Sequence, residues 1–104
     1  MESLDERASQ PVLDTKQLRT LCVMARTNNF TRAAKELGCC QSTVTTHIQL
    51  LERIFGYSLF ERNRFSKTVI LTEAGKLALD YAHRFLALVD EAKVAISESG
   101  RVSQ

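Results

Sequence analysis

The segment Phe30–Leu51 constrains the fold most, because it holds two helical patterns separated by a single glycine. We expect a first helix over 31–37, capped by Thr31, and a second over about 41–55. Gly38 suits the turn between them, since glycine adopts the left-handed conformation at a helix end without steric cost. Apolar residues recur on one face of each predicted helix: Ala33, Ala34, Leu37, Val44, Ile48 and Leu51. A small residue, a left-handed turn and an apolar anchor at this spacing are typical of a helix-turn-helix.

The second predicted helix carries polar side chains on the face opposite its apolar residues. These side chains are Gln41, Ser42, Thr45, Thr46 and Gln49. Amide and hydroxyl groups of this kind are suited to base edges and phosphates in a DNA major groove. Two ordinary helices in a small helical domain are the competing interpretation of the same spacing.

Residues on both sides of the motif predict a winged helix. A helix to about residue 28 precedes it, and Gly56 is expected to end the second motif helix. Two short runs with β-branched and aromatic residues, 59–62 and 68–71, then flank a polar, basic stretch, which is typical of a β-hairpin. On such a wing, basic side chains can meet phosphates. The basic residues expected to do so are Arg62, Arg64 and Lys67, with Arg53 added from the preceding helix.

A long helix is predicted over 72–98, capped by Thr72 and stopped by Gly100. It carries two apolar rows, of which the first has coiled-coil spacing: Ala78, Tyr81, Phe85, Leu88, Ala92, Ala95, and then Leu79, Ala82, Leu86, Val89, Ile96. So wide an apolar surface would be partly bare in a monomer. We therefore expect one row to pack on the domain and the other on a second copy. The expected dimer interface comprises Leu79, Tyr81, Phe85, Leu86, Leu88, Val89 and Ala92.

The predicted fold class is therefore mainly α. Three helices and a two-stranded hairpin form a winged helix-turn-helix over 14–71, and a linker and dimerisation helix follows over 72–98. Residues 1–13 and 99–104 are expected to be flexible tails.

The net charge of +2 is distributed unevenly along the 104 residues. The segment 15–71 holds nine basic and three acidic residues and so carries +6, whereas 1–14 carries −3 and 72–104 carries −1. Positive charge concentrated around a helix-turn-helix pattern favours a polyanionic partner. A solvated basic surface without a partner is the alternative.

Several classes of protein are disfavoured by the sequence. No apolar run approaches the ~20 residues of a membrane span, and the acidic N-terminus is unlike a secretory signal, so we expect a cytoplasmic protein. Three cysteines without C-x-x-C spacing predict neither a zinc site nor a disulfide framework. We expect no metal and no cofactor. Cys40 begins a predicted helix, where a thiolate is favoured, so a redox role stays open for it.

Two other functions compete with DNA binding. A protein-interaction domain is favoured by the long apolar helix and disfavoured by the basic segment. An enzyme would have to use Cys39, Cys40, His47 or His83, and Cys40 and His47 lie about 10 Å apart by helical rise, too far for a hydrogen-bonded pair. We expect no catalysis; His47 is interpreted as a polar residue near phosphate and His83 as a solvated one.

From about Asp14 to Ala92 the chain resembles the DNA-binding half of the LysR-type transcriptional regulators. The resemblance rests on the order and spacing of several pieces: 17–19, 30–37, 41–44, Ile48-x-x-Leu51-Glu52, Gly56, 59–62 and 71–75. It implies a winged helix-turn-helix whose linker helix pairs in a dimer, and binding to an interrupted palindrome with T and A at its outer positions. It implies groove-facing roles for Gln41, Ser42, Thr45 and Thr46, with Arg32 and Thr43 in the same motif, a phosphate contact for Thr31 and a wing role for Arg62.

The chain departs from the family pattern at specific places. Cys40 stands where the family usually has serine, so helix capping is expected to be weaker or to be taken over by Gln41 or Ser42. Thr46 stands where a longer basic or polar residue is common, and the wing is longer and lacks its frequent glycine. Family members also carry a C-terminal effector-binding domain, and we expect this chain to be an excised DNA-binding fragment or a truncated relative without one.

Overall fold

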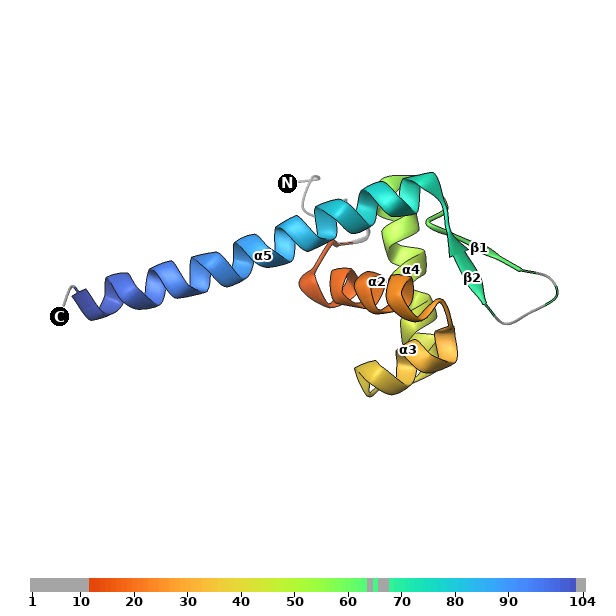
Figure 1. Cartoon of the computed structure of the whole chain (residues 1–104), viewed down its shortest axis with the longest axis horizontal. Helices are drawn as coiled ribbons and strands as arrows, with labels where there is room; N and C mark the ends of the chain where they lie inside the picture. Colours follow the sequence, from red (N-terminus) through yellow and green to blue (C-terminus); the bar gives the residue numbers. More distant parts are fainter. Residues whose placement is uncertain (1–11, 64, 66–67, 103–104) are drawn as a thin grey trace, which may run out of the picture.

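The computed structural model describes residues 12–63, 65 and 68–102 and confirms the predicted element order. Figure 1 shows a small helical domain, a hairpin that projects from it and one long helix that extends away on the other side. The elements are α2 (Thr15–Thr27), α3 (Phe30–Leu37), α4 (Gln41–Phe55), β1 (Phe60–Arg62), β2 (Val69–Leu71) and α5 (Glu73–Val102). They form the expected winged helix-turn-helix followed by a long helix.

The ends of the first two helices are set by side-chain caps. Asp14 and Gln17 form a reciprocal capping box at α2, with N···O distances of 3.0 and 3.2 Å. The prediction that Thr31 caps the next helix is wrong, because α3 begins one residue earlier and Asn29 Oδ1 accepts the Arg32 amide at 3.0 Å. Asn28 adopts a left-handed conformation with φ 55°, which leaves Asn29 extended and correctly placed as the cap.

The two predicted glycine turns are confirmed. Gly38 ends α3 with φ 68°, and Gly56 ends α4 with φ 80°. Cys40 precedes α4 but makes no side-chain capping bond, as expected for cysteine at this position.

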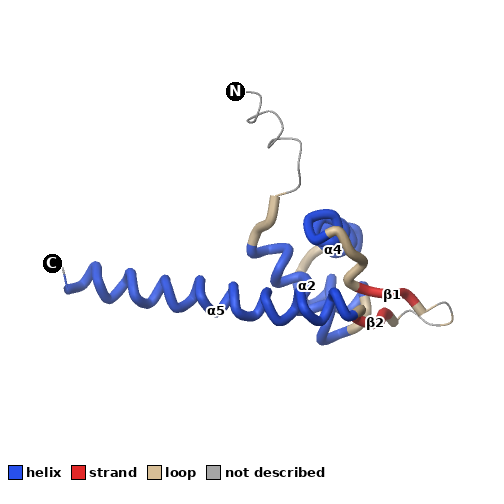
Figure 2. The backbone as a smooth tube through the Cα atoms, turned by 90° about the horizontal axis from the view of Figure 1, so that it is seen from above, coloured by secondary structure: helices blue, strands red, loops and turns tan. Residues whose placement is uncertain are grey.

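The core lies where α2 packs against the other three helices (Figure 2). Of the apolar residues predicted on the two motif helices, Leu37 is half-buried and the others are buried: Ala33, Ala34, Val44, Ile48 and Leu51. Leu18 and Leu21 of α2 are buried with them. Met24 and Leu59 are also fully buried, and Cys39 packs against the cluster as a small apolar plug. This core fixes α3 and α4 relative to each other, which positions the polar face of α4.

The hairpin is anchored to the helical domain at its base. Its strands pair antiparallel, with Phe60 opposite Leu71 and Arg62 opposite Val69. The Val69 amide donates to Asn28 O at 3.0 Å, and the Val69 side chain is only 4% exposed. The base of the wing is therefore held against the loop between α2 and α3.

The long helix begins as predicted but ends later. Thr72 Oγ1 accepts the Gly75 amide at 3.0 Å and caps α5. Gly100 was expected to stop the helix near residue 98, yet α5 continues to Val102. An interior glycine interrupts a solvent-exposed helix only at a cost of about 1 kcal/mol relative to alanine, which the turns on either side of it can absorb. No helix within the described residues is both long and apolar enough to cross a membrane.

Candidate nucleic-acid interface

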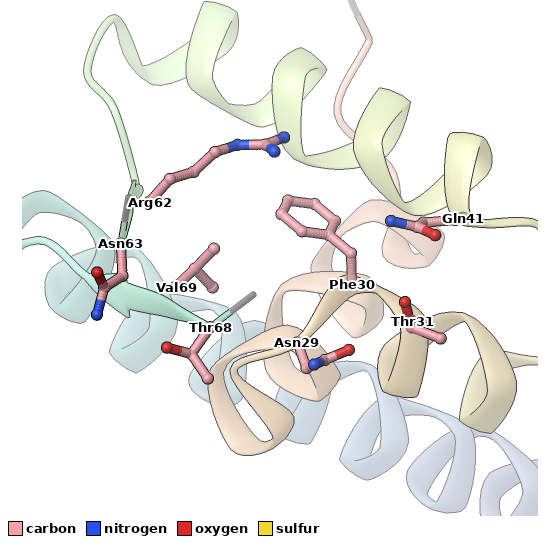
Figure 3. Close-up of a pocket in the computed structure, with 8 residues that line it drawn as sticks. All are labelled: Asn29, Phe30, Thr31, Gln41, Arg62, Asn63, Thr68 and Val69. Carbon is pink, nitrogen blue, oxygen red and sulfur yellow. The ribbon is translucent and has the colours of Figure 1, made fainter. Parts of the chain in front are cut away.

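Three elements meet at a polar pocket of about 350 Å³ between the helix-turn-helix and the wing. The start of α3 contributes Asn29, Phe30 and Thr31, the first residue of α4 contributes Gln41, and the hairpin contributes the rest: Arg62, Asn63, Thr68 and Val69. Figure 3 shows the Thr31 and Gln41 side chains close together on one side of this pocket. Residues far apart in the sequence thus present hydroxyl, amide and guanidinium groups to one space.

Arg62 is held across the pocket by an aromatic ring. Its guanidinium carbon lies 5.0 Å from the centre of the Phe30 ring, a cation–π distance, and the side chain reaches from the wing toward α4 (Figure 3). No carboxylate among the described residues pairs with Arg62. Its positive charge is therefore oriented by the fold and remains available to an anion.

The start of α3 is suited to an anion as well. The first amides of a helix lack intrahelical partners and carry partial positive charge. Asn29 satisfies one of them, at Arg32. The exposed Thr31 hydroxyl lies beside the remaining amides and lines the same pocket as Arg62.

Four of the five residues predicted on the polar face of α4 are exposed, and the fifth, Thr45, is not. Gln41, Ser42, Thr46 and Arg53 are exposed, whereas Thr43 and Thr45 are half-buried. Thr45 and Arg62 line a second hollow of about 190 Å³ between α4 and the wing, so Thr45 faces the hairpin. Arg32 is exposed on α3, and Arg64 and Lys67 lie outside the described residues.

Two carboxylates near this surface are engaged by other groups. Glu52 Oε2 accepts the Leu59 amide at 2.9 Å, which ties α4 to the start of the wing. Glu36 forms a two-pronged ion pair with Arg26, and the hydrogen bonds from Arg26 hold the pKa of Glu36 below its usual value. The ion pair offsets the negative charge of Glu36, whereas the Glu52 bond is structural.

The structure corrects the interpretation of His47. Its Nδ1 lies 2.7 Å from the Thr20 hydroxyl, which itself donates to Lys16 O at 3.0 Å. Because a hydroxyl has one proton to donate, the histidine Nδ1–H is the donor to Thr20. This hydrogen bond from His47 links α4 to α2. His83 is exposed as expected, with Nδ1 3.8 Å from Cys22 Sγ, and burial raises the pKa of that thiol.

The apolar residues of α5 divide into two groups. Ala78 and Ala82 are buried, and Leu79 and Leu86 pack against the core of their own chain. Tyr81, Phe85 and Leu88 are 43–61% exposed and lie beside Leu13 and Phe55 in a hollow of about 350 Å³. Val89 is half-buried and Ala92 exposed. Of the seven residues expected at a dimer interface, Leu79 and Leu86 are thus used mainly within the chain.

Residues 15–76 match the family model of the bacterial regulatory helix-turn-helix proteins of the lysR family. The chain belongs to the lysR family. The resemblance found in the sequence is thereby confirmed, and α3 with α4 is its helix-turn-helix. Among curated relatives, the HTH-type transcriptional regulators YwqM and YusT of Bacillus subtilis are 45% and 42% identical over 83% and 88% of this chain.

Solved structures of LysR-family DNA-binding domains share the fold. A crystal structure of a CbnR_DBD–DNA complex is 30% identical and superposes with a TM-score of 0.80 over 85% of this chain and 99% of that one. A BenM_DBD complex with catB site 1 DNA is 27% identical, with a TM-score of 0.79 over 88% and 97%. The chain spans only 29–30% of the length of YwqM and YusT.

Three contributors to the LysR-type site were not found by sequence reasoning. The ring of Phe30 lies under the Arg62 guanidinium, and Asn63 and Thr68 line the pocket. An aromatic residue beside a helix start is common, and nothing in the sequence pairs it with an arginine 32 positions later. The hairpin register supplies that pairing.

Proposed function

We propose that this LysR-type domain binds double-stranded DNA as a homodimer at an interrupted palindromic operator, with T and A at the outer positions, and so regulates transcription. The observation that carries the proposal is the convergence of Thr31, Gln41 and Arg62 on one pocket. The titles of the CbnR and BenM complexes name DNA as the partner of those similar domains, which supports the same partner here.

In this proposal α4 enters the major groove. Gln41, Ser42 and Thr46 read base edges, with Thr43 and Thr45 at the margin of the contact. Phosphates are held by Thr31 and by basic side chains of α3, α4 and the wing: Arg32, Arg53, Arg62, Arg64 and Lys67. The short Thr46 side chain leaves Gln41 as the longest groove-reading group at the start of the helix.

We propose that the exposed apolar residues of α5 form the dimer contact. The centre of this contact comprises Tyr81, Phe85 and Leu88, and Val89 and Ala92 extend it along the helix. Leu79 and Leu86 lie between this contact and the core of their own chain. A two-fold axis through this contact places half-sites one helical turn, about 10 bp, or a multiple of it apart.

The domain acts in this proposal by binding alone, in the cytoplasm, without a cofactor or catalysis. The curated relatives are named as transcriptional regulators, which supports this role. Sensing of an effector would be the task of a further domain in a longer protein.

The test is selection from random duplex DNA with the purified chain at two salt concentrations. We expect enrichment of an inverted repeat and binding that falls steeply with salt, because phosphate contacts release counterions. Binding without an enriched sequence would contradict specific readout. No binding at low salt would contradict the proposal as a whole and favour the protein-interaction alternative, which the exposed face of α5 supports.

Gln41→Ala separates base reading from phosphate binding. We expect it to flatten the sequence preference at one half-site position while affinity for random DNA is retained, since a bidentate amide contact contributes about 1–3 kcal/mol of discrimination. Equal weakening on selected and random duplexes would remove Gln41 from the base-reading set.

A further inference from the structure

The tip of the wing presents an aromatic side chain with nothing packed on it. Phe65 is 95% exposed, the most exposed large apolar residue described. Phenylalanine is costly to leave in water, because burying such a side chain is worth about 1.5–3 kcal/mol. The position therefore calls for a partner that covers the ring.

The Phe65 backbone is fixed from the hairpin side. Its amide donates to Asn63 Oδ1 at 3.0 Å, and the Asn63 amide donates to Thr68 O at 3.3 Å. Asn63 and Thr68 also line the pocket that holds Arg62. Backbone and side-chain hydrogen bonds thus connect the pocket that contains Arg62 to the aromatic tip.

The geometry of the hairpin separates the two contacts by a distance that suits DNA. Three extended residues from Arg62 to Phe65 span at most about 10 Å. A minor groove is about 6 Å wide, so a wing whose Arg62 meets one phosphate strand can bring Phe65 to the groove beside it. Figure 1 shows β1 and β2 extending away from the helical domain on the side opposite the long part of α5.

The basic residues in the sequence of the wing favour DNA over an apolar protein partner. Arg62 lies on the inner face of the hairpin, and the sequence carries further basic residues at 64 and 67. A hydrophobic partner would have to desolvate these charges, whereas phosphates on both sides of a groove would neutralise them.

We propose that Phe65 is a minor-groove wedge, which inserts its ring against or between base pairs next to the site read by α4. This inference rests on the proposed DNA binding and adds a specificity-determining residue to it. An apolar wedge unstacks a base step, so it favours base pairs without the guanine 2-amino group in the minor groove and steps that unstack easily.

Two 30-bp duplexes separate minor-groove contacts from major-groove contacts. One is alternating inosine–cytosine and the other is alternating guanine–cytosine. They present the same major-groove groups and differ only in the minor-groove amino group. Binding is measured by fluorescence anisotropy at low salt. We expect the unmodified chain to prefer the inosine duplex by about fivefold or more, since stacking on a base is worth at least that factor.

Variants then assign the preference to the ring. Phe65→Ala should abolish the preference and Phe65→Leu should keep part of it. The matched control is Ile70→Ala, since Ile70 is also exposed, at 60%, on the same hairpin but pairs opposite Glu61 away from the tip. The chain contains no tryptophan, so Phe65→Trp provides a single reporter whose emission should be quenched and shielded from acrylamide on binding.

The outcomes separate this inference from the proposed function. DNA binding with an unchanged duplex preference in Phe65→Ala, or a Phe65→Trp reporter that stays accessible, would overturn the wedge and leave the operator proposal standing. Failure of the unmodified chain to bind either duplex at low salt would overturn both.

Discussion

At the residue scale, single close approaches explain positions that the sequence pattern leaves unexplained. Gly75 is the third residue of α5, where helix propensity gives no reason for a glycine. A Cβ at this position would lie 2.2 Å from Leu59 O and 2.8 Å from Leu71 Cδ1. The glycine lets the start of α5 lie against Leu59, just before β1, and against Leu71 at the end of β2, so its role is in tertiary packing.

Gly75→Ala should therefore destabilise the domain although alanine is the better helix former. The backbone oxygen cannot move aside cheaply, and overpacking of this kind costs about 1–3 kcal/mol, more than the ~1 kcal/mol gained in helix propensity. Urea unfolding followed by circular dichroism measures the difference. Gly100→Ala is the matched control, since nothing lies within 4 Å of its added Cβ, and it should be neutral or stabilising. Equal effects of both variants would contradict the close approach.

The cysteines should differ in reactivity. Burial raises the pKa of the Cys22 thiol, so at pH 8 less of it is thiolate than in an unburied cysteine, while Cys40 is exposed. We expect iodoacetamide to modify Cys40 well before Cys22, measured by mass spectrometry of timed samples. Raising the pH should reduce the difference between the two modification rates, because more of the Cys22 thiol is then deprotonated. Faster labelling of Cys22 would mean that His83, at 3.8 Å, activates the thiol.

At the element scale, the four described helices differ in how their starts are satisfied. Asp14, Asn29 and Thr72 each accept an amide at the start of α2, α3 and α5. Cys40 offers no such bond at α4, the helix proposed to enter the major groove. The Thr43 amide donates instead to Cys40 O at 3.0 Å, so a backbone carbonyl takes the place of the missing side-chain cap.

Cys40→Ser should raise the free energy of unfolding by about 0.5–1 kcal/mol, because a serine hydroxyl can accept one of these amides. Asn29→Ala, which removes an existing cap, should lower it by about 1 kcal/mol. Both changes in the free energy of unfolding are to be measured by urea denaturation, with the m-value unchanged between variant and parent. A Cys40→Ser variant no more stable than the parent would show that α4 already satisfies its first amides in another way.

The helices and strands could be predicted from local sequence patterns, whereas the arrangement of side chains at the candidate site depends on contacts between distant residues. Glycines 38 and 56 and the apolar periodicity of α4 act within a few residues, so the helices and the hairpin could be predicted from them. The Arg62–Phe30 contact and the His47–Thr20 bond depend on how α2, α4 and the wing pack, which no local pattern encodes. Thr31 shows the limit at short range: two adjacent asparagines moved the cap by two residues.

At the scale of the whole molecule, the chain is elongated, with extents of 60 × 37 × 26 Å. Most of that length is α5, whose residues from 90 to 100 are all exposed (Figure 1). A helix with so little support from its own domain, and with an apolar row, is expected to gain its stability from a second copy.

Leu88→Glu should shift the proposed dimer to monomer, measured by sedimentation equilibrium over a range of concentrations. Leu88 is 61% exposed within the proposed contact, so a carboxylate there would be buried without a partner in the dimer. Val94→Glu is the matched control, because Val94 is 58% exposed on α5 but belongs to neither apolar row. Retained dimerisation in Leu88→Glu would place the contact elsewhere.

Because α5 is one continuous helix, a small rotation at its start produces a large displacement at its end. The thirty residues of α5 span about 45 Å. Close packing of Gly75 against Leu59 and Leu71 joins the start of the helix to the wing. A tilt of only ~10° at that joint would move the far end by about 8 Å, more than two base-pair steps of a DNA duplex. Whatever holds the distal ends of two such helices therefore sets how far apart two half-sites can be read.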